Sequence, residues 1–136
     1  MFRILTKGLI IKGNKILLLK RSEDSSFGAN LWDIPGGKLE FKETPEDTLI
    51  REIKEETDII ININRIINTS TGIDNQEKKQ YISIIYLCDY VSGEVKLDAD
   101  HTEFQWVDLN EIDEYDLVYY VKETLTKFSR KEDSHE

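Results

Sequence analysis

The chain has 136 residues, of which 39% are hydrophobic and 33% are charged. This size and composition are typical of a globular domain with its own hydrophobic core and exclude a disordered chain. The formal net charge of −9 disfavours nonspecific binding to a nucleic-acid polymer, which needs clustered Lys and Arg, but it permits a small anionic substrate offset by metal. We expect one domain over residues 1–130 and a charged tail at 131–136.

Cysteine content and hydropathy indicate the compartment. Cys88 is the one cysteine, so neither an intrachain disulfide nor a multi-cysteine zinc site can form. Its apolar neighbours predict a buried structural thiol in a reducing compartment. No apolar run approaches the ~20 residues of a membrane span, and the N-terminus lacks a signal-peptide pattern. We therefore expect a cytoplasmic protein without a membrane partner.

The first part of the chain predicts short strands followed by a helix. We expect strands at 2–11, 15–20 and 31–34, a hairpin turn at 12–14 and a polar loop at 22–30. The third strand ends at Pro35-Gly36-Gly37, where adjacent glycines permit positive φ angles and close backbone approach. A helix should start at Pro45, because Thr44 can cap it and proline suits its first position. It should run to about Thr57.

The second part of the chain predicts further strands and a last helix. β-branched and aromatic residues favour strands at 59–70, 81–90 (a central strand) and 104–107, with a loop at 72–79 and a turn at Ser92-Gly93. Apolar residues recur at helical spacing from Leu117 to Phe128, which indicates a helix packed on the core. Residues 130–136 are charged, and we expect them to be frayed.

Three glutamates share one face of the predicted helix. At 100° per residue, with Leu49 at zero, an apolar stripe covers about 0–100° and the glutamates cover about 240–340°. The stripe consists of Leu49, Ile53 and Ile50, and the glutamates are Glu52, Glu55 and Glu56. Like charges at these spacings cost roughly 0.2–0.5 kcal/mol per pair. A solvated acidic face is the simplest interpretation of such a helix.

Three features favour a cation site instead. No lysine lies four residues from any of the three glutamates, and Glu56 lies beside the apolar stripe, where its charge is partly desolvated. The Pro-Gly-Gly turn lies just upstream, with Glu43 at the helix entrance. Mg²⁺ prefers carboxylate oxygens and often bridges them to substrate phosphates. Ions held on this face would neutralise a diphosphate and lower the pKa of an attacking water.

The segment Gly37–Ile59 resembles the Nudix box, G-x5-E-x7-R-E-U-x-E-E-x-G-U, in which U is a bulky apolar residue. It matches at every defined position except the last glycine, which is Asp58 here. Because Asp adopts the left-handed conformation more readily than most residues, the penalty should be about 1 kcal/mol or less, and no metal ligand is lost. The flanking segments Leu31–Gly37 and His101–Val107 also resemble the family, so that the similarity covers most of the chain.

The resemblance implies an α+β fold of the Nudix type, an α/β/α sandwich with a mixed sheet and a loop-helix-loop box. It implies Mg²⁺-dependent hydrolysis, with Mn²⁺ as a possible substitute, of a nucleoside diphosphate linked to another group X. The products would be a nucleoside monophosphate and phosphorylated X, or pyrophosphate. The implied metal ligands are Glu52, Glu55, Glu56 and the backbone of Gly37. Arg51 would orient a box carboxylate through a bidentate pair, and Glu43 would support the cluster or bind an additional metal.

The resemblance leaves the general base open, because relatives use either a box glutamate or one from a downstream loop. Here Glu55 or Glu56 competes with Glu103, at the entrance to a strand. Candidate substrate-binding residues are Lys20 and Arg21 for phosphates, and Phe27, Trp32 and Trp106 for stacking on a base. Strand-end solvation explains the two basic residues equally well, and core packing is the first interpretation of the two tryptophans. We interpret His101 as a satisfied or surface histidine.

The range of possible substrates can be narrowed only by eliminating known subgroups of the family. Pro35 and Pro45 are the only prolines, so the proline that many ADP-ribose hydrolysing relatives carry past the box is absent. Lys20-Arg21-Ser22 matches only the start of the signature of the coenzyme A subgroup of the family. Relatives that hydrolyse dinucleoside polyphosphates tend to have a tyrosine soon after the box, and Tyr81 lies too far past it. A nucleoside triphosphate remains the first hypothesis, with ADP-ribose or a dinucleoside polyphosphate as alternatives. A non-catalytic Nudix-fold nucleotide-binding or regulatory module and an acidic scaffold are competing functions. We expect a monomer or a homodimer.

Overall fold

The structure is a computed structural model, which describes the backbone of residues 1–133 and the side chains of residues 1–128. Its strands are β1 (Phe2–Lys12), β2 (Lys15–Arg21), β3 (Trp32–Asp33), β4 (Gly36–Lys38), β5 (Ile60–Asp74), β6 (Lys79–Ser92) and β7 (His101–Asp108). Its helices are α1 (Pro45–Thr57), the 3₁₀ helix η1 (Leu109–Glu114) and α2 (Tyr119–Asp133).

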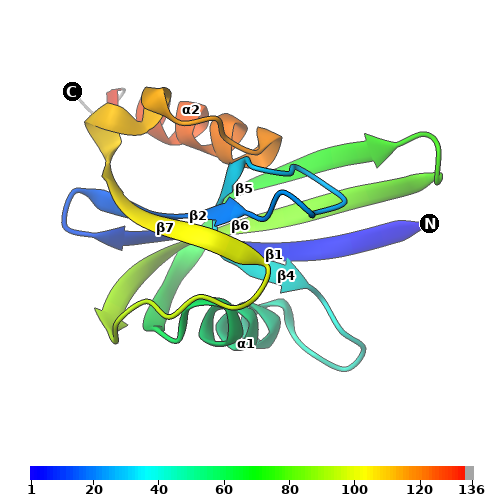
Figure 1. The fold of residues 1–136 in the computed structure, drawn as a ribbon, viewed down its shortest axis with the longest axis horizontal. Coiled ribbons are helices and arrows are strands. Elements are labelled where there is room, and N and C mark those ends of the chain that lie inside the picture. The colour runs from blue at the N-terminus through cyan, green and yellow to red at the C-terminus, as the bar shows by residue number, and fades with distance from the viewer. Residues whose placement is uncertain (134–136) are drawn as a thin grey trace.

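The seven strands form one mixed sheet between the two α-helices. The strand order is β3-β2-β1-β6-β5, with β4 paired to β1 and β7 paired to β2. β1 and β6 run parallel, and the other pairs are antiparallel. Helix α1 covers one face of the sheet and α2 covers the other (Figure 1). This arrangement confirms the predicted α/β/α sandwich.

Alternation along the strands divides the core into two clusters, one on each face of the sheet. In β1, Leu9 belongs to the cluster under α2, and Ile10 belongs to the cluster under α1. Cys88 is buried in the α1 cluster, and burial raises the pKa of its thiol to about 12. The prediction of a buried structural thiol is therefore confirmed. None of the helices within residues 1–133 is long and apolar enough to cross a membrane.

Helix α1 has the predicted bounds, and its two ends show why. The Thr44 side chain accepts a hydrogen bond from the backbone N–H of Asp47 at 3.1 Å, and Pro45 occupies the first position. At the other end, Asp58 adopts the left-handed conformation (φ 59°) that the family glycine would supply, and its N–H caps the Lys54 carbonyl. The prediction that Ile50 is buried is wrong, because it lies at the edge of the helix face that packs on the sheet and is 50% exposed.

Four sequence expectations need correction. The predicted loop at 72–79 shrinks to a turn at 75–78, because Asp74 and Lys79 still pair in the β5–β6 ladder. The Pro-Gly-Gly turn continues as β4, which pairs with β1, and η1 was not predicted. The expected fraying of 130–136 is wrong for 130–133, which continue α2. Residues 134–136 lie outside the described residues.

Candidate active site

Arg51 gathers the carboxylates of the box on the outer face of α1. Its Nε and Nη2 donate to the two oxygens of Glu43 at 2.8 and 2.9 Å, a bidentate pair. Its Nη1 donates to Glu52 Oε1 at 3.0 Å and to Glu55 Oε2 at 3.3 Å. Because one guanidinium donates hydrogen bonds to three carboxylates, it offsets part of the repulsion that the sequence predicts for this helix.

Both oxygens of Glu43 are engaged by protein donors. Besides the Arg51 pair, Oε1 accepts a hydrogen bond from the Thr48 hydroxyl at 2.9 Å. The hydrogen bond from Arg51 lowers the pKa of Glu43 to about 2. In return, Glu43 raises the pKa of Arg51 above its ordinary value. This geometry suits Glu43 to positioning Arg51 more than to binding a metal directly.

The two glycines of β4 bring the backbone against two glutamates of α1. The N–H of Gly36 donates to Glu56 Oε1 at 2.9 Å. At Gly37, a Cβ atom would lie 2.4 Å from the carboxylate carbon of Glu52, so that only glycine leaves the carboxylate in place. Glu52 and Glu56 are therefore held at the turn, whereas Glu55, with a side chain 58% exposed, extends into solvent.

A buried lysine supports this turn from the sheet side. Lys7 is 5% exposed, and its Nζ donates to Asp33 Oδ2 at 3.3 Å, to the Ile34 carbonyl at 3.2 Å and to the Gly36 carbonyl at 3.3 Å. The Tyr120 hydroxyl donates to the same Asp33 carboxylate. Because both carbonyls belong to the turn, the lysine fixes the backbone that holds Glu56.

Glu56 is the buried member of the box. Only 9% of it is exposed, and burial raises the pKa of its carboxyl to about 8 despite the nearby Lys7 cation. Burial likewise raises the pKa of Glu52. With a pKa of about 8, the Glu56 carboxyl is mostly neutral at pH 7 unless a cation reaches it. A cation bound by these side chains would therefore take the place of the proton on the Glu56 carboxyl.

Sequence reasoning missed two neighbours of Glu56. Ligand atoms of Glu56, Asp98 and His101 lie within 4.8 Å of one another. Asp98 is held by a hydrogen bond from its N–H to the Glu56 carbonyl at 3.2 Å, and it contacts His101 Nδ1 at 2.8 Å. His101 is 9% exposed, and its ring nitrogen contacts Asp98. It is therefore a buried histidine with a hydrogen-bond partner and not a surface histidine. The Asp-x-x-His spacing just before β7 is the only sequence signal that could have drawn attention to the pair.

The residues at this turn fit a divalent cation. Glu56 and Asp98 offer carboxylate oxygens close to each other, and Glu52 and Glu55, on the same helix as Glu56, would have to join them around an ion. Carboxylate oxygens are the ligands that Mg²⁺ and Mn²⁺ prefer. The imidazole of His101 could join as a ligand or orient Asp98. A divalent ion is thus compatible with the donor set and with the raised pKa of Glu56.

Glu103 and the basic residues of β2 do not join this cluster by any described contact. Glu103 pairs with Lys20 across the β2–β7 ladder, at 3.4 Å between charged atoms. Arg21 donates to the Phe27 carbonyl at 2.8 Å and to Asp33 Oδ2 at 3.1 Å. Lys20 and Arg21 therefore have protein partners, which weakens their assignment to phosphates.

The aromatic candidates are spread over both faces of the sheet. Trp32 packs against the α2 cluster, edge to face with Tyr115 at 5.2 Å between ring centroids. Trp106 packs against the α1 cluster, with Tyr90 at 5.6 Å. The two tryptophans therefore cannot line one base pocket. Phe27 is 46% exposed, and it alone of the three leaves about half of its surface free for stacking.

We expect the metal-free protein to lose stability as the pH rises from about 5 to 8. The folded pKa of Glu56, about 8, exceeds its ordinary value of 4.5, so the folded state keeps a proton that the unfolded state releases in this window. The free energy of unfolding should therefore fall by at most about 1.4 kcal/mol per pH unit. Urea unfolding in EDTA, with Glu56→Gln as reference, measures this. A wild-type minus variant difference that does not change with pH would contradict it.

The family model, the relatives and the solved structures that match this chain agree with one another. Residues 3–128 match the family model described as NUDIX domain. An ADP-ribose pyrophosphatase of Methanocaldococcus jannaschii is 37% identical over 105 residues, which are 77% of this chain but only 61% of that protein, less than two thirds of its length. A nucleoside triphosphatase NudI of Escherichia coli is 30% identical over 126 residues, 86% of this chain and 89% of the relative. The crystal structure of a MutT protein from Methanosarcina mazei Go1 superposes with a TM-score of 0.86 at 32% identity, and covers 96% of this chain and 95% of that one.

Proposed function

Because the chain belongs to the NUDIX domain family, we propose that it is a pyrophosphohydrolase that cleaves nucleoside diphosphates linked to another group X. The products are a nucleoside monophosphate and phosphorylated X, or pyrophosphate when the substrate is a triphosphate. One observation carries the proposal: Glu52 and Glu56 are held against the Gly36-Gly37 backbone, with a buried carboxyl that a cation would ionise.

In this proposal Glu52, Glu55 and Glu56 would hold Mg²⁺, or Mn²⁺ in its place, beside the backbone of Gly37. The ion, when bound, offsets phosphate charge and makes an attacking water more acidic. Arg51 and Glu43 keep the glutamates in position through their bidentate pair. A carboxylate oxygen of Glu56, which adjoins Asp98 and His101, would accept the proton of the attacking water, and Glu103 is disfavoured as the base because it pairs with Lys20.

A nucleoside triphosphate is the first proposed substrate, and ADP-ribose is the second. The NudI relative supports the first, because its alignment covers nearly the whole of both proteins. The more identical relative, named for ADP-ribose, keeps the second open, although the match covers 61% of it. A non-catalytic nucleotide-binding module is disfavoured, since Glu43, Arg51 and all three helix glutamates are retained.

A substrate panel should show turnover that depends on a divalent ion. We expect phosphate release from at least one nucleoside triphosphate after coupling to inorganic pyrophosphatase, or from ADP-ribose coupled to a phosphatase. Activity should be present with Mg²⁺ and lost in EDTA. No turnover on any nucleotide, with Glu55→Gln and wild type indistinguishable, would contradict the proposed hydrolysis. Thermal stabilisation by a nucleotide without turnover would support the binding-module alternative.

A further inference from the structure

One buried carboxylate joins four segments of the chain. Asp33 of β3 is fully buried, and its Oδ2 accepts hydrogen bonds from Lys7 Nζ at 3.3 Å and from Arg21 Nη1 at 3.1 Å. The Tyr120 hydroxyl and the Ile34 N–H each donate to Oδ1 at 2.7 Å. A buried charge is stable only where such partners surround it. Asp33 therefore fixes β1, the end of β2 and the start of α2 around the turn that follows β3.

On one side, this junction reaches the turn of the candidate active site. Lys7 Nζ also donates to the Ile34 and Gly36 carbonyls, at 3.2 and 3.3 Å. The N–H of Gly36 in turn donates to Glu56 Oε1 at 2.9 Å. The Gly36 backbone packs closely on β1, since a Cβ there would lie 2.7 Å from the Lys7 Cα. A shift of Lys7 would therefore move the peptide that holds Glu56.

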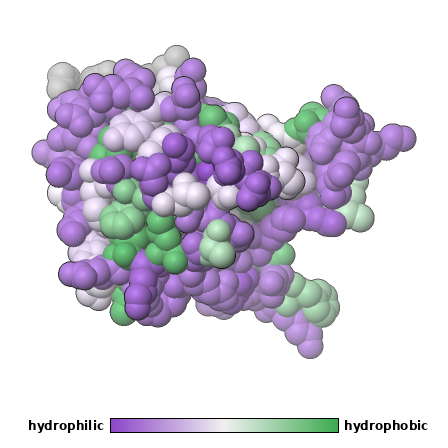
Figure 2. Space-filling model, in the orientation of Figure 1, coloured by the Kyte–Doolittle hydropathy of each residue, from purple (hydrophilic) through white to green (hydrophobic). Residues whose placement is uncertain are grey.

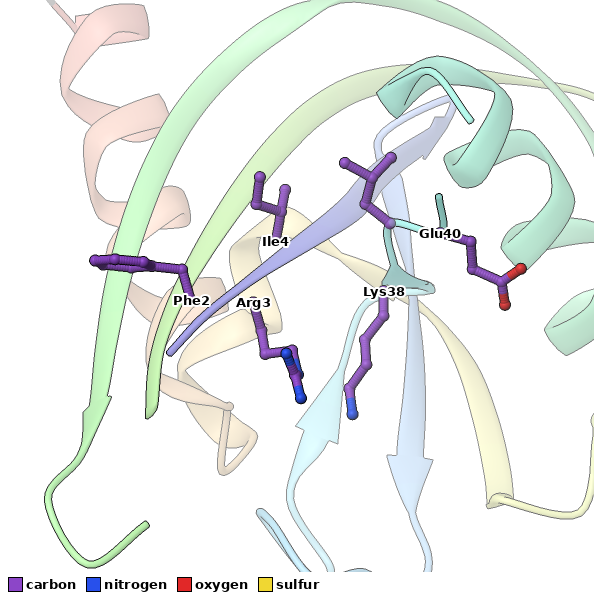
Figure 3. A pocket seen from close by; sticks show the side chains of 6 residues that line it. Phe2, Arg3, Ile4, Lys38 and Glu40 are labelled. Atoms are coloured by element: carbon purple, nitrogen blue, oxygen red, sulfur yellow. The ribbon is translucent and has the colours of Figure 1, made fainter. Parts of the chain in front are cut away.

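The chain just after this turn borders open space. A hollow of about 430 Å³ begins at Lys38, between the start of β1 and the segment after β4. It is lined by Phe2, Arg3, Ile4, Lys38, Leu39 and Glu40. Arg3 and Lys38 point to one side of β1 and Ile4 points to the other (Figure 3). The same hollow separates two projections of the surface in Figure 2. The contacts that hold the turn therefore come from its buried side, where Lys7 lies.

On the other side, the junction reaches the loop 22–30. Arg21 Nε donates to the Phe27 carbonyl at 2.8 Å, while Nη1 of the same guanidinium donates to Asp33. The Arg21 Cζ also lies 5.5 Å from the centroid of the Phe27 ring. A guanidinium presents its N–H groups in fixed directions, whereas a lysine ammonium is a flexible point charge. Arg21 therefore links the loop to Asp33 in a way that lysine would not reproduce.

A second chain of hydrogen bonds links the same loop to Glu56. The N–H of Ser22, the first residue of the loop, donates to the Asp100 carbonyl at 3.1 Å. In the segment that contains Asp100, the Asp98 N–H donates to the Glu56 carbonyl at 3.2 Å. The loop is thus tied to Glu56 by two routes, and it presents the half-exposed ring of Phe27 to solvent.

We propose that Arg21 is a positioning residue, which couples the loop 22–30 through Asp33 to the turn of the active site. The proposal rests on the proposed hydrolysis, in which a substrate group reaches the loop at Phe27. Contact there would steady the loop, and Arg21 would transmit this order to the turn that holds Glu56. Because a coupling free energy acts in both directions, loosening Arg21 should also loosen the turn.

Hydrogen exchange in the metal-free protein tests this coupling with Arg21→Lys. NMR should show the Gly36 amide exchanging about tenfold faster relative to the Cys88 amide, as expected for the loss of one hydrogen bond to a charged group. Cys88 is buried in β6 and reports global unfolding. Arg65→Lys, at an exposed arginine of β5, is the matched control and should leave the ratio unchanged. An unchanged ratio in Arg21→Lys would overturn the proposal.

Steady-state kinetics separate positioning from direct binding of substrate phosphate. If Arg21 positions the turn, Arg21→Lys should lower kcat about tenfold and leave KM within about twofold of wild type. A higher KM with unchanged kcat would show that Arg21 binds the substrate itself, and it would overturn the proposal. The exchange measurement needs no turnover. It therefore decides the coupling even if wild type hydrolyses no nucleotide, a result that would contradict the proposed hydrolysis.

Tyr120→Phe tests the junction from the side of α2. Asp33→Asn would leave the buried Lys7 cation without its carboxylate, a loss large enough to prevent folding. Tyr120→Phe removes only the hydroxyl that donates to Asp33 and keeps the buried ring. It should raise the exchange ratio of the Gly36 amide about threefold, whereas Tyr115→Phe, at a partly exposed tyrosine, should not. No change in Tyr120→Phe would show that Asp33 does not carry the coupling.

Discussion

Replacing Glu56 with glutamine is expected to lower kcat by about a thousandfold while leaving the metal-free fold intact. Glutamine keeps an oxygen for the Gly36 N–H, which holds Glu56 at 2.9 Å. It cannot lose a proton, however, and so it cannot supply the charge that a divalent ion or a water proton needs. Because the carboxyl of Glu56 has a pKa of about 8, the metal-free protein already holds it neutral at pH 7, and glutamine imitates that state.

Two measurements separate this role from a structural one. Steady-state kinetics should show the loss in kcat, and thermal unfolding with and without Mg²⁺ should show that the variant no longer gains stability from the ion. Glu94→Gln, at an exposed acid after β6, is the control and should retain both properties. A Glu56→Gln enzyme with more than about a tenth of wild-type kcat would remove Glu56 from the chemistry.

Helix α1 could be predicted from the sequence because its determinants are local. The Thr44 cap, Pro45 and the left-handed Asp58 lie within the segment they delimit, and the structure has each of them. The contacts of Arg51 with Glu43 and Glu55 also span only eight and four residues. Helical periodicity places Glu55 one turn after Arg51, whereas Glu43 lies in the loop two residues before the helix begins and is close to Arg51 only in sequence.

The neighbours of Glu56 could not be predicted in this way, because tertiary packing sets them. Asp98 and His101 reach Glu56 through the segment between β6 and β7, whose path depends on β7 joining β2 at the far edge of the sheet. Lys7 likewise lies 29 residues before the Gly36 carbonyl it contacts. Ile50 shows the opposite error: its spacing suits the buried stripe, but it lies at the edge of the helix face that packs on the sheet and is 50% exposed.

Replacing Gly36 with alanine is expected to cost about 4 kcal/mol of unfolding free energy or to prevent folding. A Cβ at this position would lie 1.9 Å from the Thr6 carbonyl oxygen and 2.7 Å from the Lys7 Cα, and both are backbone atoms that no rotamer change can move. The φ of 141° adds strain, because side chains rarely adopt it. β4 would have to separate from β1, and the N–H that holds Glu56 would move with it, so residual folded protein should also bind Mg²⁺ weakly.

Gly13→Ala is the matched control for this substitution. Gly13 also has a positive φ, 63°, but nothing lies within 4 Å of its Cβ position. The free energy of unfolding lost in Gly13→Ala should therefore reflect backbone strain alone, about 1 kcal/mol. Urea unfolding of both variants and wild type measures the two free energies. Equal losses of unfolding free energy in the Gly36 and Gly13 variants would show that β4 can move away from β1 without a further energetic cost. The close approach of the Gly36 backbone to β1 would then not be what positions Glu56.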